Sequence, residues 1–230
     1  MKTLPTLAVV LSLATLSCAS LAAQEESQED LIRKLKGQAG QTPARGLNTR
    51  GLQTRGGISA TAVAPEVATR SVLVPAGARG VPQSVQVAVE ENKVEAKETA
   101  TGAVEITYTV DPKSEVSRDN IFFRKGSADF ADDASVAVVV TLADALKHPD
   151  LKGLKYVVEG HASAEGNDLS NLILSQQRAE AIVSVLASLG VERDRLVPVG
   201  FGESKSRFPE TSPDALLKQD RRVLIFRLEK

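Results

Sequence analysis

Residues 113–230 alternate short apolar segments with longer amphipathic ones, and few architectures can accommodate that alternation. Strands are expected at 120–126, 155–160, 196–202 and 223–228, and helices at 131–149 and 169–189. The order strand, helix, strand, helix, strand, followed by a loop and a last strand, allows the helices to pack on one face of a mixed sheet. We therefore predict an α/β (α+β) domain, a βαβαβ sandwich preceded by a flexible N-terminal region.

Both expected helices carry an apolar stripe at helical spacing. The first stripe consists of Val136, Val139, Val140, Ala143 and Leu146, and Pro149 ends that helix. The second stripe consists of Leu172, Ala179, Ile182, Val183, Leu186 and Leu189, and Gly190 follows it as a stop signal. We expect these stripes to face the sheet.

Residues 1–23 have the pattern of an export signal, in which a short basic start precedes an apolar run. That run, 7–16, is too short to span a bilayer, for which roughly 20 apolar residues are needed. Two processing routes stay open: ordinary cleavage near residues 22–24, or lipidation of Cys18, although Thr15 stands where a bacterial lipidation motif normally has Leu. Since Cys18 is the only cysteine, we expect no internal disulfide.

Three segments separate this signal from the domain that begins at residue 113. Residues 24–36 predict a short charged helix, either a solvated leader or a helix that docks on a partner. Residues 37–83 predict a flexible basic linker, because Arg45, Arg50 and Arg55 repeat at a spacing that fits neither helix nor strand. Its alternative role is contact with anionic envelope polymers or lipid head groups. In 84–112, the segments 84–90 and 102–110 alternate apolar and polar residues and predict a hairpin or lead-in.

Composition argues against nucleic-acid binding. The formal net charge is −1, the aromatic share is 3% and the chain has no Trp, so neither a strong basic charge nor a stacking platform is present. Catalysis is not expected either, since His161 and Ser163 in one loop have no identifiable acid to orient them. His161 and Glu165 make a weak metal pair, so we predict no metal and no cofactor.

The stretch "GHASAEGNDLSNLILSQQRAEAIVSVL", residues 160–186, contains the most specific candidate site. Gly160 and Gly166 would let the backbone approach a ligand, and the following helix N-terminus favours an anionic group. Asn171, Ser175 and Arg178 fall on one side of that helix. An arginine in this place either grips a ligand carboxylate with two parallel hydrogen bonds or pairs with an acid such as Glu165 or Asp168. The residue spacing alone does not decide between these two roles.

The motifs of this region resemble the C-terminal domain of the outer membrane protein A (OmpA-like) family over about residues 117–230. They are the turn "GHASAEG", Asn171, "LSQQRA", "LGV", "GFGE" and "RRV". The resemblance implies a periplasmic domain that binds peptidoglycan non-covalently, holding the diaminopimelate of the stem peptide between an Asp in the turn and an Arg on the next helix. The Arg falls on Arg178, beside Asn171, and the Asp falls on Ser163 in the turn that also contains Ala162.

Ser163 is therefore the main departure from the family pattern. A serine hydroxyl offers the ligand's ammonium only a neutral hydrogen bond, and losing one charge-assisted bond costs roughly 1.5–3 kcal/mol, or about tenfold to over a hundredfold in affinity. Glu165 or Asp168 would restore the charge if the loop turns either inward. Arg221 and Arg222 match the family's "RRV" motif. We expect them either near the same cleft or in a salt bridge.

The sequence thus predicts a non-catalytic envelope protein on the periplasmic side of the outer membrane. Its expected partner is peptidoglycan, with outer-membrane lipid or an outer-membrane protein as further partners and no nucleic acid. The alternative is an interaction module of the same fold that recognises another envelope protein, with residues 24–110 as its docking arm.

Overall fold

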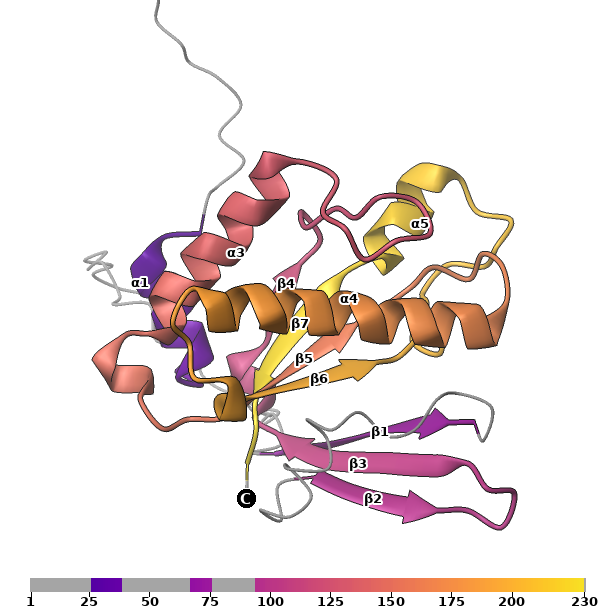
Figure 1. Ribbon diagram of the computed structural model, residues 1–230, viewed down its shortest axis with the longest axis horizontal. Helices are drawn as coiled ribbons and strands as arrows, with labels where there is room; N and C mark the ends of the chain where they lie inside the picture. Colours follow the sequence, from indigo (N-terminus) through magenta and orange to yellow (C-terminus); the bar gives the residue numbers. More distant parts are fainter. Residues whose placement is uncertain (1–25, 39–66, 76–93, 230) are drawn as a thin grey trace, which may run out of the picture.

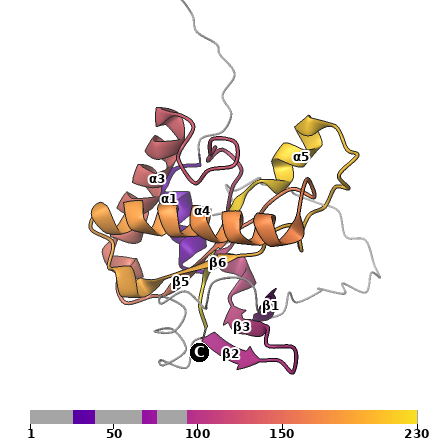
Figure 2. The same ribbon diagram turned by 45° about the vertical axis from the view of Figure 1, so that its right-hand side comes forward.

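The computed structural model describes residues 26–38, 67–75 and 94–229, which form three layers (Figure 1). A four-stranded sheet lies in the middle, with helices on one face and a three-stranded sheet on the other. The helices are α1 (Gln28–Leu35), α3 (Asp133–Leu146), α4 (Asp168–Ser188) and α5 (Asp214–Asp220), with 3₁₀ turns η1 (Pro112–Ser114), η2 (Pro149–Leu151) and η3 (Arg193–Arg195). Figure 2 shows α3 and α4 together on the side opposite β1, β2 and β3.

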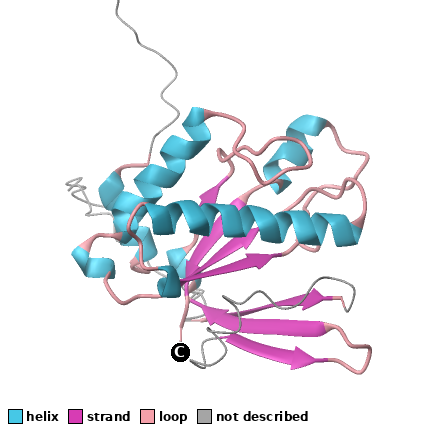
Figure 3. Cartoon of the chain, viewed as in Figure 1, coloured by secondary structure: helices cyan, strands magenta, loops and turns pink. Residues whose placement is uncertain are grey.

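The central sheet has the mixed topology that the sequence predicts. Its strands are β4 (Val116–Arg118), β5 (Tyr156–Gly160), β6 (Leu196–Gly200) and β7 (Val223–Arg227), in the order β4-β7-β5-β6. Figure 3 shows these strands in magenta beneath the cyan helices. β5 and β6 are parallel, whereas β7 runs antiparallel to both of its neighbours. Every residue of β5 and β6 is buried, as expected of strands covered on both faces.

The first strand of this sheet lies elsewhere than predicted. It is β4, whereas 120–126 forms turns with only an isolated bridge between Phe123 and Phe130. Gly126 takes a φ of 67°, and the amide of Arg124 donates to the carbonyl of Asp129 (2.9 Å), so the chain reverses instead of extending. The two phenyl rings stack at 5.2 Å between centroids and bury the apolar character that suggested a strand.

α3 presents part of the expected face to the core, turned about its axis. Val139, Ala143 and Leu146 of the predicted stripe are buried, but Val136 and Val140 are 36% and 37% exposed, while Ser135, Leu142 and Ala145 are buried instead. The reason lies in Ser135, whose hydroxyl accepts a hydrogen bond from the Phe122 amide (2.9 Å) and so turns that side of the helix inward. A stripe of valines alone could not reveal this rotation, because it contains no polar anchor.

α4 lies directly across β5 and β6, at a point where each strand ends in glycine. Gly160 and Gly200 are register partners. A Cβ on Gly160 would lie 2.2 Å from the Ser175 carbonyl oxygen, and one on Gly200 would lie 2.4 Å from the Gln176 amide nitrogen. Gly160 therefore admits the helix backbone, where the sequence suggested close approach of a ligand. The predicted apolar stripe of α4 holds, with Ala179, Ile182, Val183 and Leu186 fully buried.

α1 is a helix where one was predicted, but it packs against its own chain. Ser27 caps it by accepting from the Asp30 amide (3.2 Å). Leu31 and Leu35 are completely buried in the core that also contains α3 and β4 residues, and the Tyr156 hydroxyl donates to the Leu35 carbonyl (3.2 Å). The helix is thus neither a solvated leader nor free to dock on a partner through this apolar face.

The second sheet consists of β1 (Ala68–Val74), β2 (Val94–Glu98) and β3 (Val104–Val110), in the antiparallel order β1-β3-β2. β3 matches a predicted strand. β2 lies in the polar stretch expected to connect the hairpin, and the other expected strand, 84–90, lies outside the described residues. β1 lies within 37–83, which was expected to be a linker; the rest of that linker beyond residue 38, and residues 1–23 with Cys18, are also outside the described residues.

A buried ionic network joins the two sheets. The carboxylate of Glu159, on β5, is fully buried and accepts from the Tyr108 hydroxyl (2.6 Å) and from Arg70 Nη2 (2.7 Å), while Arg70 Nε lies 2.6 Å from its other oxygen. The Arg70 guanidinium also lies over the Phe226 ring, 4.5 Å from its centroid. Apolar side chains of both sheets pack around it, so Arg70 of β1 and Tyr108 of β3 fix the small sheet to β5.

We expect Gly160→Ala to lower the free energy of unfolding by about 2–3 kcal/mol, because the new methyl meets helix backbone that cannot move aside. Gly153→Ala is the matched control: its methyl meets nothing within 4 Å, and only its φ of 76° is penalised, at about 1 kcal/mol. Urea denaturation followed by circular dichroism measures both. Equal losses would show that α4 does not depend on this close approach.

We expect Glu159→Gln to lower the free energy of unfolding by about 3 kcal/mol, because it leaves the half-buried Arg70 cation without its carboxylate. Glu105→Gln makes the same change at an exposed position of β3 and should stay within about 0.5 kcal/mol. Chemical denaturation of both variants provides the comparison. A loss in Glu159→Gln no larger than in the control would contradict a structural role for the network.

Candidate functional site

A cavity of about 150 Å³ opens between the loop before α3, the end of β5, α4 and the chain from α5 into β7. Its lining combines two phenylalanines with several cations. The lining residues are Ile121, Phe122, Phe123, Gly160, His161, Arg178, Lys218, Arg221, Arg222 and Val223. Of the residues predicted for the site, Arg178 and Arg222 line this cavity directly.

Arg178 is a cation without an acidic partner among the described residues. Its Nε donates to the Ser127 carbonyl (3.0 Å), and its guanidinium lies over the Phe123 ring, 5.1 Å from the centroid. Burial, followed by the positive charge of Arg221, lowers the pKa of Arg178 below its ordinary value. The predicted alternative of a salt bridge to Glu165 or Asp168 is wrong, because no ion pair joins Arg178 to either residue.

Ser163 and Glu165 form one polar unit beside the cavity. The buried Ser163 hydroxyl donates to Glu165 Oε2 (2.9 Å), which also pairs with Arg221 Nη1 (2.8 Å). The loop thus brings a carboxylate next to the Ser163 hydroxyl. Arg221 lines the cavity and so connects the Ser163–Glu165 pair with the cavity. Its other terminal nitrogen, Nη2, pairs with Asp214 (2.8 Å).

Asn171 holds the loop in place. Its side-chain amide donates to the carbonyls of Ser163 (3.3 Å) and Glu165 (2.9 Å) and to Glu203 Oε2 (2.6 Å). These bonds connect α4 to the loop after β5 and to the loop after β6. Asn171 therefore positions Ser163 and Glu165 from the helix.

The remaining predicted residues have different surroundings. Ala162 is buried, and its amide donates to the Gly202 carbonyl (2.8 Å). Asp168 is exposed in the first turn of α4, and within the described chain no hydrogen bond or ion pair joins it to the cavity. Arg222 forms an internal salt bridge with Asp220 (3.3 Å) as well as lining the cavity, so both alternatives for it hold together.

His161 belongs to the buried network as much as to the cavity. Its Nε2 lies 3.2 Å from Glu159 Oε2, and its ring stacks on Phe201 at 5.1 Å between centroids. Burial lowers the pKa of His161 despite the opposing effect of Glu159, and the charges of Arg222 and Arg70 add to the lowering. The ring therefore packs and hydrogen-bonds, as the sequence indicated, although its partner is on β5 and not within the turn.

Sequence reasoning missed Phe122, Phe123 and Lys218 as lining residues. The two aromatics were assigned to a strand, and Lys218 lies on α5, a helix that was expected to be loop. The run "KQDRRV" was the available signal, since three of its six residues are basic. Spacing alone could not bring this run beside α4, because the contact joins segments about 40 residues apart.

Two further observations concern the part of the chain that the structure describes. No group of three or more His, Cys, Asp or Glu side chains there is arranged to hold a metal ion. No helix in that part is both long and apolar enough to cross a membrane.

Comparison with known proteins confirms the resemblance found in the sequence. Residues 122–218 match the model of the OmpA family. A peptidoglycan-associated lipoprotein from Buchnera aphidicola subsp. Baizongia pistaciae is 31% identical over 72 residues, which are 31% of this chain and 42% of that protein. Outer membrane porin F from Pseudomonas aeruginosa is 40% identical over 72 residues, 31% of this chain and 20% of the porin. The chain thus matches less than half the length of either relative.

Among solved structures, a peptidoglycan-associated lipoprotein from Burkholderia pseudomallei is similar. The sequence identity is 27%, and the match covers 51% of this chain and 93% of that structure with a TM-score of 0.42.

We expect stability to fall as the pH drops below about 6.5, in part through His161. Because its folded-state pKa is lowered, the unfolded chain binds a proton that the folded chain resists, so this contribution is full above the unfolded pKa and decreases below it. Urea denaturation at pH 7.5 and 5.5 should show that the free energy of unfolding falls less with pH in His161→Asn than in the original protein. The control is His148→Asn, at the partly exposed second histidine, which should keep the loss seen in the original protein. An unchanged loss in His161→Asn would contradict the assignment.

Proposed function

We propose that this chain, whose residues 122–218 match the OmpA family, is a non-catalytic envelope protein that binds the stem peptide of peptidoglycan non-covalently. One observation carries the proposal. Arg178 points its charge at the cavity without a carboxylate partner among the described residues, although burial and Arg221 both disfavour that charge. A carboxylate of the ligand would relieve both penalties and could form two parallel hydrogen bonds with the guanidinium.

The other end of the ligand is the ammonium group of diaminopimelate. Ser163 and Glu165 are its proposed acceptors, since the carboxylate lies 2.9 Å from the hydroxyl that stands at the family's Asp. Because Arg221 already pairs with Glu165, the ammonium would share that carboxylate. We therefore expect weaker binding at this end than an unpaired Asp would give, and a larger share of the affinity from Arg178.

Apolar contacts complete the proposed site. Phe122 is 47% exposed and lines the cavity, and Phe123 lies beneath the Arg178 guanidinium. The carbon chain of diaminopimelate would lie along these rings while its charged groups reach Arg178 and Glu165. Burying the exposed ring would add roughly 25 cal/mol for each Å² of apolar surface removed from water.

In the cell, such binding would hold the outer membrane or a periplasmic partner to the wall. The names of the matched relatives, a peptidoglycan-associated lipoprotein and an outer membrane porin, support this reading. The export signal predicted at 1–23 would deliver the chain to the periplasm, and lipidation of Cys18 would add a membrane anchor.

We expect Arg178→Ala to reduce binding to purified sacculi at least tenfold, because it removes the charge-assisted contact with the carboxylate. Arg33→Ala is the matched control, since Arg33 is a partly exposed arginine of α1 whose ion partner is Asp30. A co-sedimentation assay with the mature protein measures both. Circular dichroism of the variants separates lost binding from lost folding.

Equal binding by Arg178→Ala and the original protein would overturn the proposal. If the protein then still reached the envelope through another protein, the interaction-module alternative would replace wall binding. That alternative predicts no effect of Arg178→Ala on localisation.

A further inference from the structure

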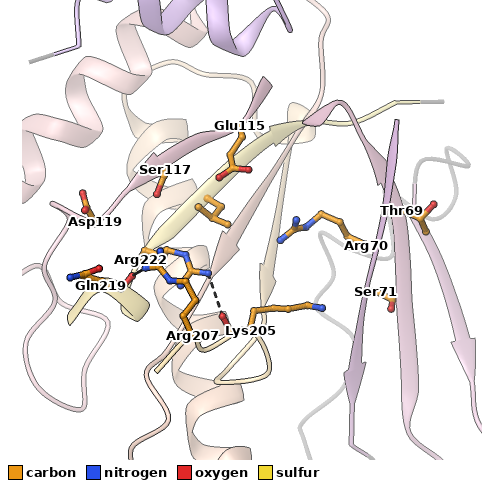
Figure 4. A pocket seen from close by; sticks show the side chains of 11 residues that line it. Thr69, Arg70, Ser71, Glu115, Ser117, Asp119, Lys205, Arg207, Gln219 and Arg222 are labelled. Atoms are coloured by element: carbon orange, nitrogen blue, oxygen red, sulfur yellow. Dashed lines mark hydrogen bonds between the residues drawn. The ribbon is translucent and has the colours of Figure 1, made fainter. Parts of the chain in front are cut away.

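A second and larger cavity, of about 650 Å³, lies where the two sheets meet at their edges (Figure 4). β1 contributes Thr69, Arg70 and Ser71 on one side, and β4 with its flanks contributes Glu115, Ser117 and Asp119 on another. Lys205, Arg207, Gln219, Arg222 and Leu224 complete the lining. Because β1 belongs to the small sheet, this cavity exists only while that sheet is docked on the domain.

One wall of the cavity carries an excess of positive charge. Arg207 and Arg222 share the single carboxylate of Asp220, at 3.1 Å and 3.3 Å. Lys205 is exposed, and within the described residues no ion pair engages its ammonium. Burial, followed by the positive charge of Arg207, lowers the pKa of Arg222, against the opposing effects of Asp220, Glu115 and Glu159. An anion placed here would be attracted by all three.

The opposite wall is acidic. Glu115, Ser117 and Asp119 alternate along β4 and its flanks, so their side chains share one side of the extended chain, and all three are exposed. Among the described residues, neither the Glu115 carboxylate nor the Asp119 carboxylate forms an ion pair. Figure 4 shows them across the cavity from Lys205 and Arg207. Arg70, which reaches into the cavity from β1, is already paired with Glu159.

We propose that this cavity is a second binding site, which takes a zwitterion of the amino-acid type: a free amino acid or a short peptide with a free carboxylate and a free ammonium. Lys205, Arg207 and Arg222 bind the carboxylate, and Glu115 and Asp119 bind the ammonium. The hydroxyl of Ser117 and the side-chain amide of Gln219 satisfy the peptide groups between them. The volume lies in the range of small-molecule sites and exceeds the needs of one amino acid.

This site is separate from the one proposed for the wall peptide. The two cavities share only Arg222, and Arg178 lines the smaller one alone. The inference does not depend on peptidoglycan binding, because it rests on the opposed charges of a different set of residues.

The test is a titration of the mature protein with alanine, alanyl-alanine and trialanine, followed by NMR chemical shifts. Alanyl-alanine is also offered in its N-acetylated form, which lacks the ammonium, and its C-terminal amide, which lacks the carboxylate. We expect at least fivefold tighter binding of the intact zwitterion than of either blocked form. Whichever of the three compounds binds most tightly shows whether the site takes a free amino acid or a peptide.

Lys205→Glu and Glu115→Gln should each weaken alanyl-alanine binding at least fivefold, and both positions are exposed, so the fold should persist. Arg178→Ala should leave it unchanged, whether or not that variant loses binding to sacculi. The proposal is overturned if the blocked forms bind as well as the zwitterion, or if Lys205→Glu has no effect. It is also overturned if Arg178→Ala removes the binding, which would place the ligand in the smaller cavity.

Discussion

The buried carboxylate of Glu159 is the contact on which both faces of the molecule depend. An isolated charge at zero exposure would be too costly to retain, so the chain surrounds it with Arg70, Tyr108 and His161. Arg70 and Tyr108 come from the small sheet, whereas His161 lines the smaller cavity. One side chain of β5 therefore connects the docking of an added sheet with the loop that begins the candidate site.

The site itself follows from how closely α4 can approach the sheet. The glycine pair at the ends of β5 and β6 removes the side chains that would separate helix from strands. At that distance the Ser175 hydroxyl accepts from the Gly202 amide (2.8 Å), and Asn171 reaches the loop carbonyls. Arg178 is then held over Phe123, on the side where the chain between α5 and β7 brings in Arg221 and Arg222. The cations gather because backbone packing places their elements together.

The sequence was sufficient for the elements whose pattern is local. The strands β5, β6 and β7, the helix α4 and the role of Arg178 as a cavity cation follow from apolar periodicity, glycine stops and family motifs. What could not be predicted depends on distant partners: the inward rotation of α3 through Ser135 and Phe122, the burial of Leu31 and Leu35, and the pairing of Glu165 with Arg221. β2 was missed because its strand is short and polar on the exposed side, and only its pairing with β3 defines it.

The packing of α1 has a mechanical consequence. A force that pulls the chain from its N-terminal side reaches this helix before it reaches β5 or α4. To pass further, it must extract Leu31 and Leu35, whose burial is worth about 1.5–3 kcal/mol each, and break the Lys36–Asp150 and Arg118–Glu26 ion pairs. The helix would therefore yield first under tension and absorb work before the strain reaches the central sheet.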